Sequence, residues 1–305
     1  MTTTKEHKRD NQLFWETQES SIYCCYKEEP IDSQIRFLHC HDGYEVLIMK
    51  AGDIAMQIED HLVSLHSGDI LLIPPYVFHF ARQQSSETYC RIVLNIKESA
   101  IQKLISRNEG YRHLTDVFYQ AADFRIHVDD STLLQLLRLS QALQAATEDS
   151  SDRFGNDILM ISLLSVILVL LNRQRETSSE IPPVTASSFS QSMPEVVKDI
   201  FHYVDQNLGG KLSVAEIADR AHLNSVYLTR MFRQYTGVSL QQYIIEKKLA
   251  EAKRLLRNGQ SPMDVCFACG FNNYSNFSRT FTNHVKISPR QYQENSRASF
   301  TPYSS

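Results

Sequence analysis

The chain has 305 residues, of which 42% are hydrophobic and 22% charged, so it is long enough for two domains and is neither fibrous nor wholly disordered. Its six cysteines fit no secreted disulfide framework, residues 1–11 are too polar for a signal peptide, and the longest apolar run, 158–171, is shorter than a bilayer span. The net charge of −4 combines −9 over residues 1–192 with +5 over residues 193–305, a distribution typical of a chain that binds a polyanion with its C-terminal end. We therefore expect a cytoplasmic protein with no membrane-embedded segment.

The first half of the chain contains short runs typical of strands. Apolar runs at residues 44–49, 54–58 and 69–75 are separated by turn residues within the region 35–96, which predicts an antiparallel β-barrel or sandwich. Helices are expected next at 133–147 and 156–175. The second helix is apolar on nearly every side, so it is either a core helix or a surface that packs against a second subunit.

Residues 177–193, with the sequence TSSEIPPVTASSFSQSM, contain six serines and a proline pair. This composition predicts a linker. The linker divides the chain into an N-terminal domain, residues 1–176, and a C-terminal domain, residues 194–296.

The C-terminal domain contains an internal repeat. Helices are predicted at 195–207, 214–221, 226–235, 240–256, 262–269 and 274–284. Two of the predicted segments, 212–232 and 261–281, each combine a short helix, a tight turn and a second helix with an Arg-x-Phe element, and Arg230 and Arg279 are 49 residues apart. This pattern is typical of a double helix-turn-helix.

Each second helix is expected to bury one face and expose the other. Leu228 with Phe232, and Phe277 with Phe281, lie at i and i+4 and should pack inward. The outward face should contact base edges or phosphates of double-stranded DNA in the major groove. The residues predicted on this face are Val226, Thr229, Arg230, Tyr274, Ser275, Ser278 and Arg279. The helix at 240–256 is about 25 Å long, so it can hold the two faces about one duplex turn apart.

Residues 194–293 resemble the DNA-binding domain of the AraC/XylS family of transcription regulators. The resemblance is carried by Cys269-Gly270-Phe271, by residues 276–281, and by Ile287-Ser288-Pro289 with Tyr292. It implies a homodimer that binds DNA and RNA polymerase, responds to a small-molecule effector, and activates transcription. The sequence departs from the family pattern at Leu240, Lys286 and Gln293. Cys266 and Cys269 form a CxxC within a predicted helix, and without further ligands at metal spacing we interpret them as buried small residues.

A second resemblance lies in the N-terminal domain. His39, His41 and Glu45, followed by the run from Gly68 to His79, look like the cupin double motif. The resemblance implies that His39, His41, Glu45 and His79 stand at the positions of the usual cupin metal ligands. Ser33 and Tyr76 replace expected glycines, and Gln83 replaces an expected Asn.

Two interpretations of these residues follow. Imidazole and carboxylate groups can ligate a divalent metal ion, or they can hydrogen-bond the hydroxyls of a sugar-like effector. We favour the effector, with no catalytic residue and no obligatory cofactor. The predicted effector contacts are His39, His41, Tyr44, Glu45, Tyr76 and His79, with Trp15 of the N-terminal arm as a further candidate. The alternative is a metal-dependent cupin enzyme, or a metal sensor, tethered to DNA by its C-terminal domain.

Overall fold

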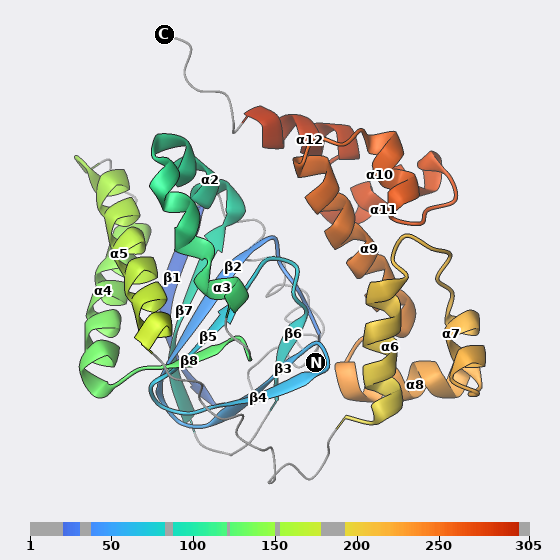
Figure 1. Ribbon diagram of the computed structural model, residues 1–305, viewed down its shortest axis with the longest axis horizontal. Helices are drawn as coiled ribbons and strands as arrows, with labels where there is room; N and C mark the ends of the chain where they lie inside the picture. The colour runs from blue at the N-terminus through green and yellow to red at the C-terminus, as the bar shows by residue number, and fades with distance from the viewer. Residues whose placement is uncertain are drawn as a thin grey trace, which may run out of the picture. The chain divides into compact units, whose positions relative to one another are not determined.

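The computed structural model describes residues 21–30, 38–82, 88–120, 123–149, 153–177 and 193–298. The chain divides into two compact units, Met1–Phe189 and Ser190–Ser305 (Figure 1). This division falls inside the segment 177–193 that the sequence predicts as a linker, although residues 178–192 lie outside the described residues. Trp15, Ser33 and Gln83 also lie outside them.

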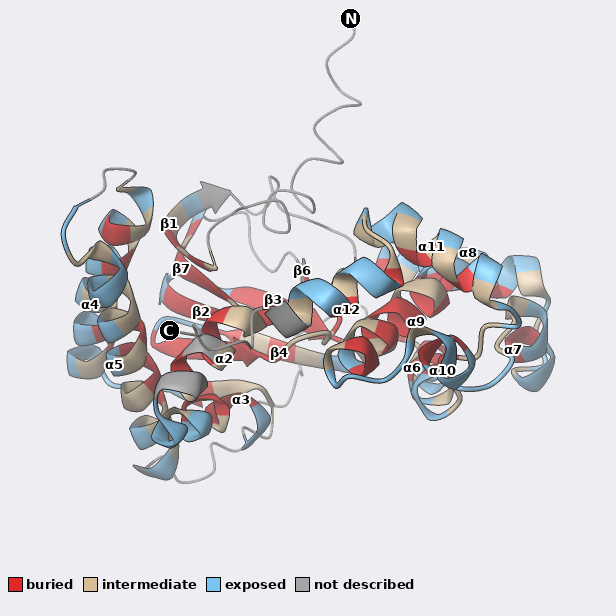
Figure 2. Ribbon diagram, turned by 90° about the horizontal axis from the view of Figure 1, so that it is seen from above, coloured by how far each residue is buried: buried red, intermediate tan, exposed pale blue. Residues whose placement is uncertain are grey.

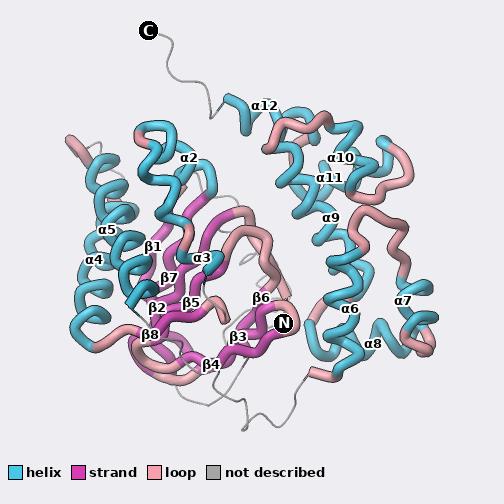
Figure 3. The backbone as a smooth tube through the Cα atoms, in the orientation of Figure 1, coloured by secondary structure: helices cyan, strands magenta, loops and turns pink. Residues whose placement is uncertain are grey.

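The N-terminal unit contains two antiparallel sheets (Figure 3). One sheet has five strands in the order β1-β7-β2-β5-β8, and the other has three in the order β4-β3-β6. Their bounds are β1 Ile22–Pro30, β2 Gly43–Ala51, β3 Ile54–Ile58, β4 His61–Leu65, β5 Asp69–Ile73, β6 His79–Arg82, β7 Thr88–Lys97 and β8 Arg125–His127. The antiparallel, cupin-like fold that the sequence predicts is confirmed.

Most of strand β2 is buried (Figure 2), which explains why its sequence is almost continuously apolar. Leu47 and Met49 pack into the cluster between the two sheets, together with residues of β3 and β4. Val46 and Ile48 point to the opposite face and pack under the helices. Because alternate side chains of a strand point to opposite faces, a strand buried on both sides has little room for polar residues.

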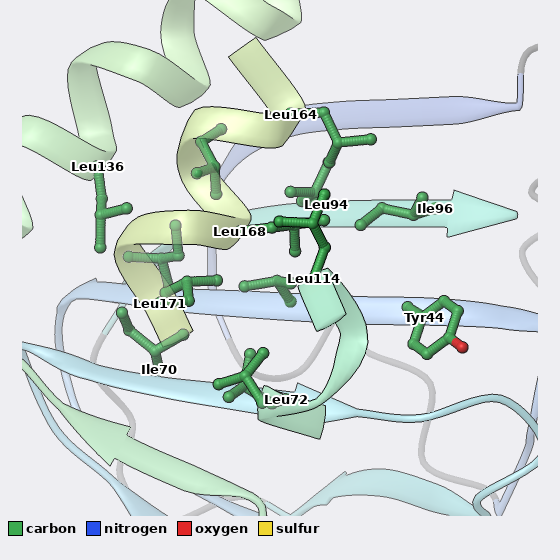
Figure 4. Packing of buried hydrophobic residues seen from close by; sticks show 14 of the residues in the cluster. Tyr44, Ile70, Leu72, Leu94, Ile96, Leu114, Leu136, Leu164, Leu168 and Leu171 are labelled. Carbon is green, nitrogen blue, oxygen red and sulfur yellow. The ribbon is translucent and has the colours of Figure 1, made fainter. Parts of the chain in front are cut away.

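Helices cover the outer face of the five-stranded sheet. They are α2 Glu98–Arg107, the 3-10 helix η2 Glu109–Thr115, α3 Val117–Gln120, α4 Asp130–Glu148 and α5 Asn156–Thr177. Asp129 caps α4, since its side chain accepts a hydrogen bond from the backbone N–H of Thr132. Figure 4 shows Leu164, Leu168 and Leu171 of α5 beside apolar side chains of the sheet, and all three are fully buried. One side of α5 therefore belongs to the core.

The other side of α5 faces away from the sheet. Ile158, Leu159 and Val166 expose 61%, 50% and 45% of their surface. The sequence predicts that this apolar run is too short for a bilayer, but the complete helix is longer, and among the described residues it is the one helix long and apolar enough to cross a membrane. The buried leucines on its inner side make it a core helix that leaves an apolar strip uncovered.

The C-terminal unit is helical throughout its described part. Its helices are α6 Glu195–Gln206, α7 Val214–Arg220, α8 Ser225–Thr236, α9 Leu240–Arg257, α10 Pro262–Ala268, α11 Tyr274–Val285 and α12 Pro289–Ala298. The six predicted helices are present. Helix α12 is not predicted, because the run PRQYQENSRA is polar apart from its tyrosine and shows no apolar period.

The internal repeat is visible in the caps of the two second helices. Asn224 and Asn273 are the N-cap residues of α8 and α11, and each side chain accepts a hydrogen bond from a backbone N–H of the first turn. Gly237 and Lys286 are the C-cap residues, both in the left-handed conformation. We call α7 with α8 the first module and α10 with α11 the second module.

Both modules pack against α9. In the first module Phe232 lies 5.5 Å from Phe201 of α6 and 5.4 Å from Tyr243 of α9, measured between ring centroids. In the second module Phe277 and Phe281 are fully buried with residues of α9 and α10. The predicted inward faces of both second helices are therefore confirmed.

Candidate functional sites

Three polar side chains meet at one end of the space between the two sheets. Glu45 lies on β2, His79 begins β6, and His41 lies just before β2. Oε2 of Glu45 is 2.8 Å from Nε2 of His41 and 3.2 Å from Nε2 of His79. Both imidazoles are buried, with side-chain exposures of 6% and 2%, and Glu45 exposes 13%. We call these three residues the His–Glu–His cluster.

Backbone carbonyls fix the orientation of both imidazole rings. Nδ1 of His41 lies 2.8 Å from the carbonyl oxygen of Gly43, and Nδ1 of His79 lies 2.9 Å from that of Val77. A carbonyl oxygen only accepts, so each Nδ1 carries the hydrogen. Nε2 of each ring therefore faces Glu45, either with a second proton or with its lone pair.

The charges in the cluster support one another. Burial disfavours the protonated form of His41, but the hydrogen bond to Glu45 and the negative charge of that carboxylate outweigh burial and raise the pKa of His41. Burial would likewise raise the pKa of Glu45, but the hydrogen bond with His41 and the nearby imidazole of His79 lower it well below its ordinary value. Glu45 is therefore a largely buried carboxylate, hydrogen-bonded to His41 and facing the imidazole of His79.

The structure places the other predicted effector residues differently. His39 does not share a strand with Glu45: it pairs with His79 in an isolated bridge, with ring centroids 4.4 Å apart. Tyr76 has φ of 66°, the conformation for which a glycine is expected, and its N–H donates to the carbonyl of His41 over 2.9 Å. Both lie beside the cluster, although in the described part of the chain only His41, Glu45 and His79 bring metal-binding atoms within 4.8 Å of one another.

Tyr44 lies on the wrong face of the sheet for the predicted role. Its ring packs 4.7 Å from that of Phe118, and its hydroxyl lies 3.4 Å from that of Tyr119, on the side covered by helices. Strand alternation explains the error, because Tyr44 precedes Glu45 and must point the opposite way. Tyr44 therefore does not contact the His–Glu–His cluster from within the sheets.

Asn95 is a site residue that sequence reasoning misses. It pairs with Glu45 across the antiparallel register of β2 and β7, so the two side chains lie on the same face. Asn95 is 8% exposed, and its Oδ1 is buried without a hydrogen-bond partner among the described residues. Asn95 is the one polar residue in the apolar run Ile92–Ile96, and this sequence feature could have identified it.

The predicted DNA-facing residues of the first module lie on the exposed side of α8. Val226 is 77% exposed, Arg230 is exposed, and Thr229 is partly exposed. They line an open groove beside α7. Arg233 and Gln234 line the same groove and extend the predicted face by one helical turn. The sequence analysis does not predict these two residues.

The second module presents the corresponding face of α11. Ser275 and Arg279 are exposed, and Tyr274 and Ser278 are partly exposed. Nη2 of Arg279 donates to Oδ1 of Asn276 over 3.2 Å, which holds the guanidinium along the helix surface. The seven predicted residues therefore occupy two equivalent helix faces, one in each module.

Three other residues singled out in the sequence have internal roles. Cys266 and Cys269 are fully buried, and burial raises the pKa of Cys269 to about 12, so neither is a reactive thiol. Gln293 is 7% exposed, and its amide donates to the carbonyls of Leu256 and Gln260 over 3.4 Å and 2.6 Å. It fastens α12 to the end of α9.

Two family models match this chain. A model described as an AraC-like ligand binding domain matches residues 22–168, and one described as a helix-turn-helix domain matches residues 217–295. The first match spans the two sheets and most of their helices. The second begins within α7 and extends into α12.

Curated relatives match over most of their own length. The Msm operon regulatory protein of Streptococcus mutans is 22% identical over 254 residues, which cover 83% of this chain and 84% of the relative. The probable transcriptional regulator LumQ of Photobacterium leiognathi is 25% identical over 275 residues, covering 88% and 96%. The HTH-type transcriptional activator RhaR of Yersinia pestis is 24% identical over 267 residues, covering 84% of each chain. These relatives are transcription regulators rather than enzymes, and with both domain matches the chain belongs to the AraC family of DNA-binding transcription regulators.

Proposed function

We propose that this regulator binds double-stranded DNA with the exposed faces of α8 and α11. The contacts come from Val226, Thr229, Arg230, Tyr274, Ser275, Ser278 and Arg279 within the domain 194–296. Two equivalent faces, each with an exposed arginine, support this proposal, because arginine is the usual partner of guanine in the major groove. The excess of five positive charges over residues 193–305 favours association with the phosphate backbone.

The N-terminal domain, residues 1–176, binds a small polyhydroxylated effector, a carbohydrate, at the His–Glu–His cluster. The observation that carries this assignment is the buried acceptor Oδ1 of Asn95, unpartnered among the described residues, beside the carboxylate of Glu45. Sugar hydroxyls both donate and accept, so one can donate to Asn95 while its neighbour contacts Glu45 or His79. His39 and Tyr76 complete the contact set.

The uncovered strip of α5 joins two copies of the chain. Ile158, Leu159 and Val166 form an apolar surface on a helix whose opposite side is core, and such a surface is typically covered by a partner. A homodimer brings two DNA-binding domains to repeated operator elements. We assign the protein to the cytoplasm and to activation through RNA polymerase, in line with the name of the Yersinia relative, a transcriptional activator.

Effector binding regulates the protein by favouring one of two arrangements of its domains. The ligand can shift this equilibrium only by the difference between its affinities for the two arrangements. Since Glu45 lies on the central strand β2, a ligand that moves this strand also moves the packing beneath α3 and α5.

A panel of sugars and divalent metal salts tests the effector assignment by thermal unfolding of the purified protein. We expect one sugar or a small related group to raise the midpoint, with no effect of a chelator. Asn95→Leu should abolish the shift. A panel in which no sugar shifts the midpoint, or in which Asn95→Leu responds as wild type does, contradicts the assignment.

A divalent metal ion is the second candidate for the His–Glu–His cluster. With both Nδ1 atoms bound to carbonyls, two Nε2 lone pairs and a carboxylate oxygen converge within 4.8 Å, a donor set that suits Mn, Fe, Ni or Zn. His41, Glu45 and His79 would hold the ion, which would supply an open coordination position for an effector oxygen. Stabilisation that requires added metal and is lost with a chelator would favour this candidate.

A further inference from the structure

Lys248 is a buried cation in the middle of α9. It is 7% exposed, and its Nζ donates to the carbonyl oxygen of Gly270 over 2.8 Å and to that of Gly210 over 3.2 Å. The ammonium also lies 5.6 Å from the ring centroid of Phe271. Burial lowers the pKa of this lysine, whereas carbonyl oxygens and the face of an aromatic ring favour an ammonium group.

The two carbonyls belong to different parts of the DNA-binding domain. Gly210 lies in the loop between α6 and α7 and leads into the first module, whereas Gly270 lies in the turn between α10 and α11 of the second module. Helix α9 connects the modules in sequence. One side chain of the connecting helix therefore bonds both to the second module and to the loop that leads into the first.

The loop that carries Gly209 and Gly210 also approaches the backbone of the second module directly. Gly270 has φ of 66°, and a Cβ added to it would lie 2.3 Å from the carbonyl oxygen of Gly210 and 2.8 Å from Nζ of Lys248. A Cβ on Gly209 would lie 3.0 Å from the carbonyl oxygen of Ala268. Glycines are required here because the loop and the turn approach too closely for side chains.

We infer that Lys248 is a positioning residue that holds the two helix-turn-helix modules as one rigid unit, so that the protein binds only operators whose two elements have one fixed spacing. The inference rests on the proposed contacts of α8 and α11 with DNA. Each base pair added between the elements displaces one element by about 3.4 Å and rotates it by about 35°. A rigid pair of modules cannot follow that change, whereas a pair joined only by the helix can adjust.

The test begins with duplexes selected from a random library by the full-length wild-type protein. Affinities are then measured for the best duplex and for versions with one base pair inserted or removed between the two selected elements. For wild type we expect each change to weaken binding about a hundredfold. Lys248→Met keeps the length of the side chain without its donors, and should bind the best duplex about tenfold more weakly. In this variant, the loss of affinity caused by inserting or removing one base pair should fall below about fivefold, since the modules can then move independently.

Lys247→Met is the matched control. It removes the same charge from the adjacent position, but Nζ of Lys247 pairs with Asp205 of α6 at 2.7 Å. We expect this variant to keep the wild-type loss on insertion. Gly209→Ala is a second test, because its methyl group pushes the loop away from the second module without changing charge.

Cooperative thermal unfolding establishes that each variant is folded, and Gly209→Ala decides the question if Lys248→Met is not. A folded Lys248→Met or Gly209→Ala with the wild-type dependence on spacing overturns the inference. If the wild-type protein selects no two-element duplex, the proposed DNA contacts are wrong instead. This outcome is distinguishable because the selection is done with wild type before any variant is measured.

Discussion

Gly237 and Lys286 end helices α8 and α11 in the same left-handed conformation, with φ of 78° and 69°. They stand 49 residues apart, the same separation as Arg230 and Arg279, so they are equivalent positions of the repeat. Glycine adopts this conformation without strain, whereas a residue with a Cβ does so at a cost of about 1 kcal/mol. The second module therefore carries a strain that the first module avoids.

Lys286→Gly should stabilise the C-terminal unit by about 1 kcal/mol. Nζ of Lys286 donates to the carbonyl of Asn283, but this exposed bond contributes little. Urea unfolding followed by circular dichroism measures the change. Gly237→Lys is the reciprocal variant and should destabilise the C-terminal unit by a similar amount. If both variants change the free energy of unfolding in the same direction, the explanation is wrong.

The His41–Glu45 pair should make stability depend on pH. The pKa of His41 is raised above its ordinary value of 6.5, so its contribution is complete below that pH and is lost as pH rises through the raised value. The pKa of Glu45 is lowered from 4.5, so its contribution is lost only in stronger acid. His41→Gln should therefore cost most, roughly 2 kcal/mol, in mildly acidic solution and progressively less above neutrality.

Thermal midpoints of wild type and His41→Gln across pH, with chelator present, measure this difference. His61→Gln is the control, since His61 is 59% exposed beside Asp60 and should show no such trend. If the thermal midpoint of His41→Gln falls further below that of wild type as pH rises, the two residues do not form a charged pair.

Asn95→Leu should separate ligand binding from folding. Because the buried Oδ1 of Asn95 has no hydrogen-bond partner among the described residues, its removal should leave the free energy of unfolding unchanged or raise it by about 1 kcal/mol. Gln57→Leu is the contrast, because the Gln57 amide donates to the carbonyls of Glu59 and His61. That variant should lose roughly 2 kcal/mol in denaturant titrations. A clear loss of stability in Asn95→Leu would show that this side chain serves the fold.

Arg230→Ala and Arg279→Ala should each weaken binding to the selected duplex by about 10- to 100-fold. Sugar-dependent stabilisation should persist, because neither residue belongs to the N-terminal unit. Fluorescence anisotropy measures the first property and thermal unfolding the second. Arg254→Ala removes an exposed arginine that is paired with Glu251 on α9, and its affinity should stay close to wild type. Wild-type affinity in both test variants would exclude the proposed recognition faces.

Val166→Glu should convert the proposed dimer to monomers. A charge placed in the apolar strip of α5 would be buried between subunits, and we expect the dissociation constant to rise by about a hundredfold. Sedimentation equilibrium gives the constant directly. Glu176→Ala alters an exposed residue of the same helix outside the strip and should leave the dimer intact. A monomeric wild type would refute the assignment outright.

Local patterns made the C-terminal domain predictable to within a residue or two at most helix ends. Caps such as Asn224 and Asn273 and the buried i, i+4 aromatic residues are local signals. The strand β8 and the partner of Lys248 could not be found in this way. Arg125–His127 is three residues long and becomes a strand only by pairing with β5, and the Lys248 contacts join residues 22 and 38 positions away.

The His–Glu–His cluster was also predictable only in part from local patterns. The histidines and Glu45 were found from their resemblance to the cupin motif, but the face of each side chain depends on where β2 begins. The chain bends at Asp42, so the strand starts at Gly43. His39 and His41 therefore do not continue its alternation. Asn95 is recognisable as a neighbour of Glu45 only once the register of β2 and β7 is known.

Neighbouring residues of β2 serve two different surroundings. Glu45 faces the His–Glu–His cluster, while Tyr44 packs on Phe118 beneath the helices. A change in the chemistry of the effector site that shifts this strand must therefore alter the support of α3 and, through it, of α5. Variants selected for a new effector should accumulate compensating substitutions around Tyr44 and Phe118, on the side of the sheet that no ligand touches.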